Sequence, residues 1–336
     1  MRPSLLCCDW GTTTFRLRLM TISGQQCVGE LSTPLGVAQT FGDWKTNAKP
    51  AGITQEDFFR QRLKTHIDQL AGQLSLRLDG IPILISGMAS SSIGMAEVPY
   101  ATLPFALDGS QVSVRYVDSR PDFPHEVGLI SGVSSLQDVM RGEETQLIGI
   151  VSLLGWTDDR NRKAVFLFPG THAKHLFVDH DQLVHFDTYM TGELFSLMAN
   201  HSILADSVDV TDLNRMLEGD REAFKRGVHQ STTTPVLASL FTVRTNGLFN
   251  TLTKRQNALY LSGLLIGSEL GHLLAKPDWP LILCSSPNLA TVYEWAIDEL
   301  GLSARTTFVS PDLIDRAAPA GQRQLYLHEQ EKQLIP

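Results

Sequence analysis

The chain has 336 residues, of which 43% are hydrophobic and 19% are charged, and its formal net charge at pH 7 is −8. Single hydrophobic cores rarely grow beyond about 250–300 residues, so this length is enough for two domains. The acidic balance and the absence of a Lys/Arg-rich run exclude a surface built for nucleic acid or anionic membranes, and no apolar run approaches the roughly 18 residues that span a bilayer. An anionic substrate therefore needs Arg or Lys side chains placed locally.

The N-terminus and the cysteines indicate a cytoplasmic protein. Residues 1–4 lead directly into an apolar segment, which leaves no room for a signal peptide. The four cysteines are Cys7, Cys8, Cys27 and Cys284, which form no Cys-x-x-Cys pair. A bridge between the adjacent Cys7 and Cys8 would be strained. We expect reduced structural thiols rather than a catalytic cysteine.

Residues 5–19 predict a β-hairpin. The apolar first strand ends at Asp9, and the second strand alternates apolar residues with arginines at period two. The turn between them consists of Gly11, Thr12, Thr13 and Thr14. Glycine permits close approach to the turn's N–H groups, which together with threonine hydroxyls form a cradle for phosphate, and Asp9 is then placed to hold a hydrated Mg²⁺. The alternative is an ordinary hairpin in which Asp9 caps its own turn.

The following segment predicts a strand, a helix and a ligand loop. A third strand is expected over residues 26–31, followed by a polar, Gly-rich connection through Pro50. Residues 57–76 predict an amphipathic helix, and residues 81–85 a buried strand. That strand leads into a small, hydroxyl-rich loop over residues 86–95, and α/β folds bind ligands in such loops. A mobile surface loop is the alternative interpretation.

A helix that starts at Glu143 follows a strand expected over residues 112–117. Two glutamates, Glu143 and Glu144, occupy its first turn, which the helix dipole alone favours. However, Arg141 and a glycine directly precede them, which brings an anion-binding side chain and two candidate bases to one helix start. Either carboxylate can take a proton from an alcohol if burial or a close like charge raises its pKa.

Residues 164–178 repeat the opening design, with an apolar strand, a turn at Gly170 and Thr171 beside Lys174, and a second apolar strand. Two such hairpins predict two related α/β domains, each offering a phosphate loop to a shared cleft, although hairpins with glycine turns are common enough for coincidence. The polar stretch 157–163 marks the expected boundary. The predicted domains are residues 1–160 and 161–336.

The rest of the chain predicts helices and one more ligand-facing turn. Thr191 is a natural helix cap, while Glu193 can equally bind a substrate hydroxyl. Residues 206–235 are polar and predicted to be helical with a loop. Residues 258–274 form a strongly apolar helix in which Gly263 and Gly267 lie four apart, a spacing more typical of close helix packing than of a ligand site.

A last buried strand over residues 281–284 is followed by Ser285, Ser286 and a helix ending near residue 301. A strand–turn–helix unit of this kind presents backbone N–H groups, which can bind a nucleotide.

Common signatures for other chemistries are absent from the sequence. It contains no Gly-x-x-x-x-Gly-Lys-Ser/Thr loop, no Gly-x-Gly-x-x-Gly after the first strand, no His-Glu-x-x-His and no Cys/His spacing for zinc. Two phosphate hairpins, one acid for a metal and further carboxylates suit phosphoryl transfer, because positioning and charge neutralisation supply most of that catalysis.

The motifs also carry a family resemblance. Residues 9–16 resemble the first phosphate motif of the actin/hexokinase/heat-shock ATPase superfamily. Five further segments are similar to the 2-dehydro-3-deoxygalactonokinase family and run in its order over most of the chain. They are residues 87–94 with 98–100, residues 140–149, residues 169–172 with Lys174, residues 190–194, and residues 261–267. The segment 141–149 is the one most specific to that family.

The resemblance implies an α/β fold with two ribonuclease-H-like (actin-like ATPase) domains and an interdomain cleft. It implies an ATP- and Mg²⁺-dependent kinase, a phosphotransferase with an alcohol acceptor. The reaction it implies is phosphorylation of the 6-hydroxyl of 2-dehydro-3-deoxy-D-galactonate in D-galactonate catabolism. The expected partners are the sugar acid and ATP, without nucleic acid or membrane, and a homodimer is left open.

The resemblance also implies roles for individual residues. Both hairpin turns would hold ATP phosphates, assisted by Lys174 unless that lysine is a solvated charge at a strand end, and Asp9 would hold the magnesium. Arg141 suits the substrate carboxylate because of its bidentate geometry, and Glu143 and Glu144 are unranked candidates for the base. The adenosine is expected at Gly263, Gly267, Ser285 and Ser286, where the turn Ser-Ser-Pro-Asn departs from the Gly-rich turn of related kinases. The other substrate contacts expected are Met88, Ser90, Ser91, Thr191 and Glu193.

Two alternatives remain at this point. One is an actin-like-fold kinase that acts on a different sugar acid or a polyol. The other is a non-catalytic actin-like nucleotide switch or filament.

Overall fold

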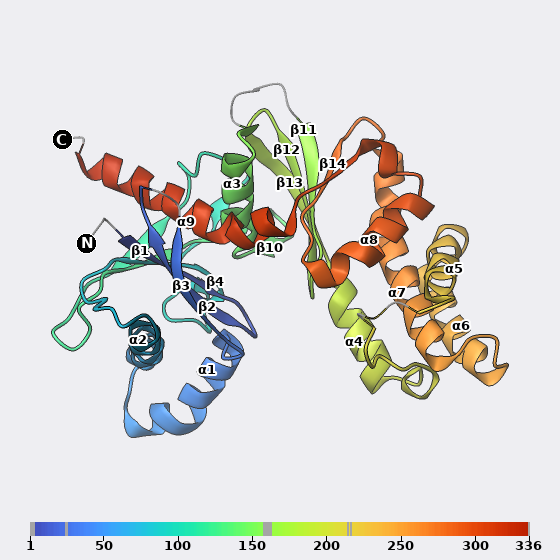
Figure 1. Ribbon diagram of the computed structural model, residues 1–336, viewed down its shortest axis with the longest axis horizontal. Helices are drawn as coiled ribbons and strands as arrows, with labels where there is room; N and C mark the ends of the chain where they lie inside the picture. The colour runs from blue at the N-terminus through green and yellow to red at the C-terminus, as the bar shows by residue number, and fades with distance from the viewer. Residues whose placement is uncertain (1–3, 24–25, 157–162, 214, 216, 335–336) are drawn as a thin grey trace. The chain divides into compact units, whose positions relative to one another are not determined.

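The computed structural model describes residues 4–23, 26–156, 163–213, 215 and 217–334 (Figure 1). The chain divides into two compact units. Unit 1 comprises Met1–Arg162, Asp179–His185 and Asp312–Pro336, and unit 2 comprises Lys163–Val178 and Phe186–Pro311. Apart from Lys163, the boundary predicted at 157–163 lies outside the described residues. The contacts differ from the predicted division at the C-terminus, because they join residues 312–336 to unit 1.

Unit 1 is built on a six-stranded sheet with the order β3-β2-β1-β4-β8-β7. The strands β1, β2 and β3 are antiparallel neighbours, β1, β4 and β8 run parallel, and β7 is antiparallel to β8. Their bounds are β1 Ser4–Trp10, β2 Phe15–Thr21, β3 Cys27–Thr33, β4 Ile83–Gly87, β7 Val114–Val117 and β8 Val127–Ile130. The predicted hairpin is confirmed as β1 and β2, with Asp9 opposite Arg16.

Smaller strands complete unit 1. A three-stranded sheet contains β5 (Ala101–Thr102), β9 (Val133–Ser134) and β10 (Val139–Met140) in the order β10-β9-β5. The strand β6 (Phe105–Ala106) pairs with Gln182 and Leu183, which belong to unit 1 as well.

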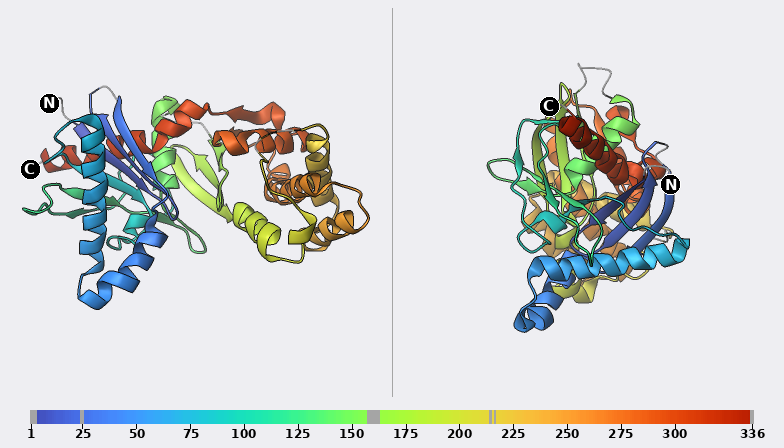
Figure 2. Two further views of the ribbon diagram at one scale, coloured as in Figure 1. Left: turned by 60° about the horizontal axis from the view of Figure 1, so that its bottom comes forward. Right: turned by 90° about the vertical axis from the view of Figure 1, so that its left-hand side faces the viewer.

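Helices cover both faces of the six-stranded sheet of unit 1. On one face, α2 (Gln55–Leu74) packs its apolar side against alternate residues of β1, β2 and β4. On the other face lies α9 (Pro311–Leu334), as Figures 1 and 2 show. Alternation explains this arrangement, because Cys8 faces the core under α2 while Cys7 faces α9.

Two helices of unit 1 were not predicted. The expected polar connection before Pro50 contains α1 (Val37–Asp43), a seven-residue helix, followed by the short turns Trp44–Ala48 and Lys49–Ala51. The 24-residue α9 contains Pro319, which removes an internal hydrogen bond and usually argues against a helix. The remaining helix, α3 (Glu143–Leu153), begins where the sequence predicted.

Unit 2 repeats this strand order. Its sheet runs β15-β14-β11-β12-β13, with β14 parallel to both β11 and β15. The strands are β11 Lys163–Phe168, β12 Ala173–Asp179, β13 Gln182–Tyr189, β14 Leu281–Leu283 and β15 Thr306–Phe308. In unit 2 the order by position in the chain is third, second, first, fourth, fifth. Unit 1 has the same order with one strand added, because β7 precedes β8 in the chain and lies beyond it at the edge of the sheet. This is the ribonuclease-H-like arrangement. The predicted α/β fold class with two related domains is confirmed.

The helices of unit 2 are α4 (Thr191–His201), α5 (Asp220–Thr233), α6 (Val236–Leu248), α7 (Lys254–Gly271) and α8 (Pro287–Glu299). The start of α7 is fixed by a capping box between Thr253 and Gln256. The segment Lys254–Ala275 has the length and composition of a membrane-crossing helix, which the sequence analysis did not expect, but 67% of its apolar window is buried. Its apolar side chains join those of α8 and the sheet in one core, as in the core helix of a globular domain.

Candidate active site

The turn of the first hairpin is held from behind by the N-terminus of α1. The N–H groups of Val37, Ala38 and Gly36 donate to the carbonyl oxygens of Gly11, Thr12 and Thr13, at 2.9, 3.0 and 3.2 Å. Gly36 lies so close to the Thr12 carbonyl group that a β carbon would not fit. The helix therefore binds the carbonyl side of this turn.

The opposite, donor side of the same turn remains exposed. The side chains of Thr12, Thr13 and Thr14 are solvent-exposed, while Gly11 N–H closes the turn onto the Thr14 oxygen at 2.9 Å. In the described part of the chain, the N–H groups of Thr12 and Thr13 donate to no protein acceptor. A turn with free N–H donors and exposed hydroxyls is suited to an anion such as phosphate.

The turn of the second hairpin is supported in the same way by α4. The N–H of Glu193 donates to the Thr171 oxygen at 3.0 Å, and a β carbon on Gly192 would lie 2.6 Å from the Gly170 oxygen. Thr171 is exposed, as its counterpart Thr12 is. The predicted repeat thus extends beyond the hairpin to the helix that backs it.

Lys174 lies beside this second turn and is not the solvated strand-end charge considered from sequence. Its side chain is buried, with 5% exposed, and its Nζ donates to the Thr188 hydroxyl of β13 at 2.5 Å. Because Lys174 belongs to β12 and Thr188 to β13, this hydrogen bond joins the two strands next to the turn.

Asp9 is the next-to-last residue of β1, close to the end of β4 and to the start of α3. Burial raises the pKa of the Asp9 carboxyl above its usual range, while Arg16 and Arg18 act in the opposite direction. Asp9 Oδ1 lies 3.4 Å from the position a β carbon would take on Gly87, the last residue of β4. A β carbon on Gly142, just before α3, would in turn lie 3.4 Å from the Gly87 Cα atom. The close approach brings the acid, the loop after β4 and the start of α3 together.

Backbone conformation explains the two glycines at this meeting point. Gly87 and Gly142 have φ values of +88° and +111°, which side-chain-bearing residues rarely adopt. The three predicted regions around Asp9, the loop after β4 and Arg141 therefore lie close together within unit 1, as one candidate site.

Arg141 is held rigidly in this site by neutral groups. Its Nη1 donates to Ser90 Oγ at 2.8 Å, its Nη2 donates to the Val98 oxygen at 2.9 Å, and its guanidinium lies 3.9 Å from the ring centre of Tyr100. The buried Nε has no hydrogen-bond partner in the described structure, and no carboxylate there forms an ion pair with Arg141. A cation stacked and oriented without a counter-charge is arranged for an anion.

The neighbouring loop residues are mostly occupied with local contacts. Ser90 is 1% exposed and Ser91 is 7% exposed. The Ser91 hydroxyl donates to the Met88 oxygen at 2.7 Å, and the Met88 side chain packs against the core under α2. Ser90 thus contributes by orienting Arg141, whereas Ser91 shapes its own turn.

The structure separates the two candidate bases. Glu144 is 1% exposed, and its two oxygens accept from the Gly142 N–H at 2.7 Å and from the Thr145 hydroxyl at 2.9 Å. Burial raises its pKa from 4.5 to about 7, and the neighbouring Glu143 adds to the shift. Glu143 is only partly buried. Glu144 is therefore bound into the helix start, while the Glu143 side chain keeps part of its surface exposed.

A buried carboxylate in unit 2 was missed by sequence reasoning. Glu269 of α7 is 3% exposed. Its carboxylate accepts hydrogen bonds from Thr191 Oγ1 at 2.5 Å and from the Tyr293 hydroxyl at 2.8 Å. Its Oε1 atom also lies 3.0 Å from His175 Nε2. The prediction of Thr191 as a helix cap is wrong, because Met190 occupies the N-cap of α4 and the Thr191 hydroxyl donates to α7 instead. The only signal in the sequence was a single acid inside an apolar helix, which no local pattern connects to residues nearly a hundred positions away.

The second predicted α4 residue, Glu193, pairs with His172, the residue after the second turn. This pair is partly exposed. It joins the first turn of α4 to the hairpin by side chains, in addition to the backbone contact at Thr171.

The four residues expected near adenosine lie in two places. Gly263 and Gly267 are buried where α5 crosses α7, and a β carbon on Gly267 would lie 2.9 Å from the Val228 Cα atom. The two glycines let α5 and α7 pack closely together, which is the interpretation that their spacing in the sequence favoured. Ser285 is 4% exposed, and Ser286 is exposed at the N-terminus of α8. The predicted strand–turn–helix is confirmed there as β14 and α8.

The metal prediction rests on one carboxylate. No group of three or more His, Cys, Asp or Glu side chains arranged for a metal ion occurs among the described residues. Magnesium is commonly bound by one or two carboxylates with water and substrate phosphates completing its shell, so Asp9 alone is compatible with it.

Comparisons with known proteins identify the family of this chain. The family described as 2-keto-3-deoxy-galactonokinase matches residues 9–324. A probable 2-dehydro-3-deoxygalactonokinase of Rhizobium meliloti (strain 1021) is 31% identical over 305 residues, covering 88% of this chain and 90% of that protein. The 2-dehydro-3-deoxygalactonokinase of Escherichia coli (strain K12) is 28% identical over 310 residues, covering 90% and 91%.

A solved structure leads to the same family. The crystal structure of a putative 2-dehydro-3-deoxygalactonokinase protein from Sinorhizobium meliloti matches with a TM-score of 0.74 and 28% identity, and the match covers 99% of this chain and 97% of that one. The resemblance inferred from the motifs is confirmed over nearly the whole length. The chain belongs to the 2-keto-3-deoxy-galactonokinase family of phosphotransferases.

Proposed function

We propose that this kinase transfers the γ-phosphoryl group of ATP to the 6-hydroxyl of 2-dehydro-3-deoxy-D-galactonate, in cytoplasmic D-galactonate catabolism. The observation that carries the proposal is the family match over residues 9–324, which includes every segment of the site in unit 1. The names of the two curated relatives support the same substrate.

The sugar acid's carboxylate is assigned to Arg141. Its guanidinium is stacked on Tyr100 and oriented by Ser90 and the Val98 carbonyl, so it is preorganised before substrate binds. A neutral polyol has no group to compensate this charge. An arginine with no carboxylate partner among the described residues therefore favours a sugar acid over a polyol.

The general base is assigned to Glu143. Glu144 is the weaker candidate because its side chain is 1% exposed and both of its oxygens accept hydrogen bonds inside the protein. Its role in the proposal is to fix Gly142 and thereby the start of α3. Glu143 is next to it, is partly exposed and carries the carboxylate needed to accept the proton of the 6-hydroxyl.

The ATP phosphates are assigned to the donor sides of the two hairpin turns, at residues 11–14 and 170–171, with Lys174 supporting the second turn. Asp9 would hold Mg²⁺, which when bound neutralises charge on the transferring phosphates. Burial raises the pKa of Asp9, and a nearby cation would stabilise the ionised carboxylate, which supports this assignment. Ser285 and Ser286 remain the candidates for adenosine, while Thr191 and Glu193 remain candidates for substrate.

The test is an acceptor panel with purified protein and Mg-ATP. We expect ADP to form rapidly with 2-dehydro-3-deoxy-D-galactonate and the product to carry phosphate on C6. Gluconate, galactonate, uncharged polyols and water serve as controls. Equal ADP formation with any of these controls would contradict the assignment, and turnover only with another sugar acid would replace the substrate while keeping the enzyme class.

A further inference from the structure

The C-terminal helix α9 contacts three parts of the site in unit 1, although none of its residues belongs to a recognised motif. It lies over β1 and β2 on the face opposite α2 (Figure 2). It also crosses α3 very closely. Neither Gly149 of α3 nor Gly321 of α9 has room for a β carbon against the other helix. The segment between residues 315 and 322 is the part that makes these contacts.

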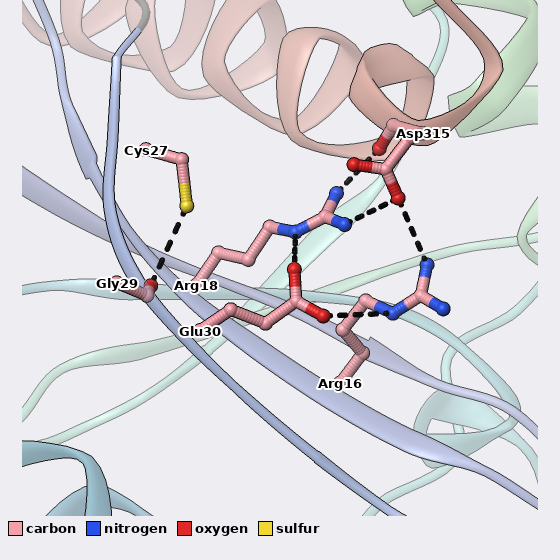
Figure 3. A network of polar contacts seen from close by, with 6 residues as sticks. All are labelled: Arg16, Arg18, Cys27, Gly29, Glu30 and Asp315. Atoms are coloured by element: carbon pink, nitrogen blue, oxygen red, sulfur yellow. Dashed lines mark hydrogen bonds and ion pairs between the residues drawn. The ribbon is translucent and has the colours of Figure 1, made fainter. Parts of the chain in front are cut away.

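At one end of this segment, a proline leaves a backbone carbonyl group available to a side chain of the sheet. Pro319 has no N–H, so the carbonyl of Asp315 loses its helical donor. Arg18 of β2 supplies a replacement, since its Nη1 donates to that carbonyl and its Nη2 to Asp315 Oδ1 at 2.6 Å, as Figure 3 shows. The Nε of Arg18 binds Glu30 of β3 at 2.5 Å. Arg18 is 5% exposed, so this network fixes α9 on the sheet.

The other end of the segment places a buried amide between two strands of the site. Gln322 is 1% exposed, and its Nε2 donates to the Cys8 oxygen at 2.7 Å and to Ser86 Oγ at 2.8 Å. Cys8 directly precedes Asp9, and Ser86 directly precedes Gly87 at the start of the ligand loop. One side-chain amide thus joins the end of β1 to the end of β4.

A small cavity lies at the same place. Its volume is about 40 Å³, and Asp9, Gln146 and Gln322 are among the residues that line it. The amide of Gln322 is therefore close to the carboxylate assigned to magnesium without being part of the predicted motifs.

We propose that Gln322 is a positioning residue of the kinase reaction, which holds Asp9 on β1 in register with the loop after β4 that carries the sugar-acid site. This inference rests on the proposed function for the identity of the two ligands. Gln322 acts through Cys8 and Ser86 and touches neither ligand. Since misplacing reacting groups by about 1 Å can cost 10²-fold in rate, loss of the amide donors should lower turnover without removing any ligand contact.

The test compares three variants on the same helix and strand. Gln322→Met keeps the side-chain length and removes both donors, and we expect kcat to fall about 10²-fold in folded protein. Ser86→Ala removes one acceptor only, and we expect a fall of about tenfold. The control is Gln324→Met, because Gln324 donates to the Asp108 oxygen at 3.2 Å, away from β1 and β4. We expect this control to stay within about twofold of the wild type.

Two readouts distinguish positioning from a structural role. In Gln322→Glu the ionised carboxylate has no proton to donate, whereas the protonated form can donate one hydrogen bond. Its kcat relative to the wild type should therefore rise as the pH is lowered. The effects of Ser86→Ala and Gln322→Met should also be less than additive, because both remove the same bond.

The proposal is overturned if folded Gln322→Met keeps kcat within about threefold of the wild type, or if the loss in Gln322→Glu is the same at every pH. If Gln322→Met does not fold, an unchanged kcat in Ser86→Ala overturns it instead. Failure of the proposed function is a separate result, because the wild type would then not use 2-dehydro-3-deoxy-D-galactonate. The variants would in that case be compared with the acceptor that the panel identifies.

Discussion

The two hairpin turns have the same backbone design and different chemistry. Both present a Gly-Thr pair and are backed by a helix N-terminus that approaches through a glycine, Gly36 in unit 1 and Gly192 in unit 2. Two residues before the turn glycine, however, unit 1 has Asp9 and unit 2 has Phe168, which is buried. The two turns therefore share the backbone features on which the proposed phosphate sites rest, while the carboxylate proposed to hold a cation belongs to the first turn.

The support beneath the two turns differs as well. In unit 1 the neutral amide of Gln322 reaches the ends of β1 and β4. In unit 2 the buried carboxylate of Glu269 holds Thr191 at the start of α4. Near the first turn, Asp9 and Glu143 are the carboxylates that we propose act on ligands, whereas near the second turn Glu269 accepts internal hydrogen bonds from Thr191 and Tyr293.

The largest effect expected from this comparison is on the proposed base. Glu143→Gln should lower kcat by about 10²–10⁴-fold, because an amide cannot accept the proton of the substrate hydroxyl. The matching change in unit 2 is Glu193→Gln, also in the first turn of a helix beside a hairpin, and it should change KM rather than kcat. Steady-state kinetics of both variants decide this. A normal kcat for Glu143→Gln would remove that residue from the mechanism.

The next effect concerns the carboxylate that only unit 1 has. Asp9→Asn should lower kcat by about 10²–10³-fold, because stabilisation of transition-state charge by a metal is worth several kcal/mol, and it should raise the Mg²⁺ concentration needed for half-maximal rate. Phe168→Leu changes the equivalent position in unit 2 and should leave the Mg²⁺ dependence unaltered. Magnesium titrations of the rate test both. Wild-type Mg²⁺ dependence in Asp9→Asn would contradict the metal role.

The buried Glu144 should give a pH effect on stability. Its folded-state pKa of about 7 exceeds the ordinary value of 4.5, so the folded state binds its proton more tightly. The stability it contributes is fully present below pH 4.5 and is lost as the pH rises to 7, by about 3 kcal/mol at most. Glu144→Gln keeps the acceptor for the Gly142 N–H and should remove this pH dependence. Urea unfolding from pH 4.5 to 8 measures the difference, and parallel curves for the two proteins would show that Glu144 ionises normally.

The smallest effects test whether the two turns are equivalent. Gly36→Ala and Gly192→Ala each insert a β carbon between a helix and a turn carbonyl, which should cost about 1–3 kcal/mol of stability and raise the KM for ATP by about tenfold. Gly42→Ala, where a β carbon meets nothing within 4 Å, is the matched control. An increased KM for only one of the two variants would show that the second turn does not bind ATP as the first does.

The sequence predicted the elements that depend on local pattern. Alternation along residues 5–19 indicated β1 and β2, and helical periodicity indicated α2, because side-chain facing in a strand or helix follows directly from its repeat. The Gly-Thr turns, with Asp9 beside the first of them, were recognisable for the same reason. The helix α9 was not, since Pro319 breaks the expected helix pattern. The donor that replaces its missing N–H at the Asp315 carbonyl is Arg18, which is 297 residues away in the chain.

The different roles of the charged and polar groups could be distinguished only in the tertiary structure. Glu143 and Glu144 are adjacent and chemically identical, so only burial and hydrogen bonding distinguish the partly exposed base candidate from the one bound to Gly142 and Thr145. Gln322 and Glu269 act on strands and helices that are remote in sequence. The sequence by itself therefore determined the family and the repeated hairpins. The three-dimensional packing decided which polar side chains remain open to ligands, because desolvation and hydrogen-bond partners depend on contacts that no local pattern records.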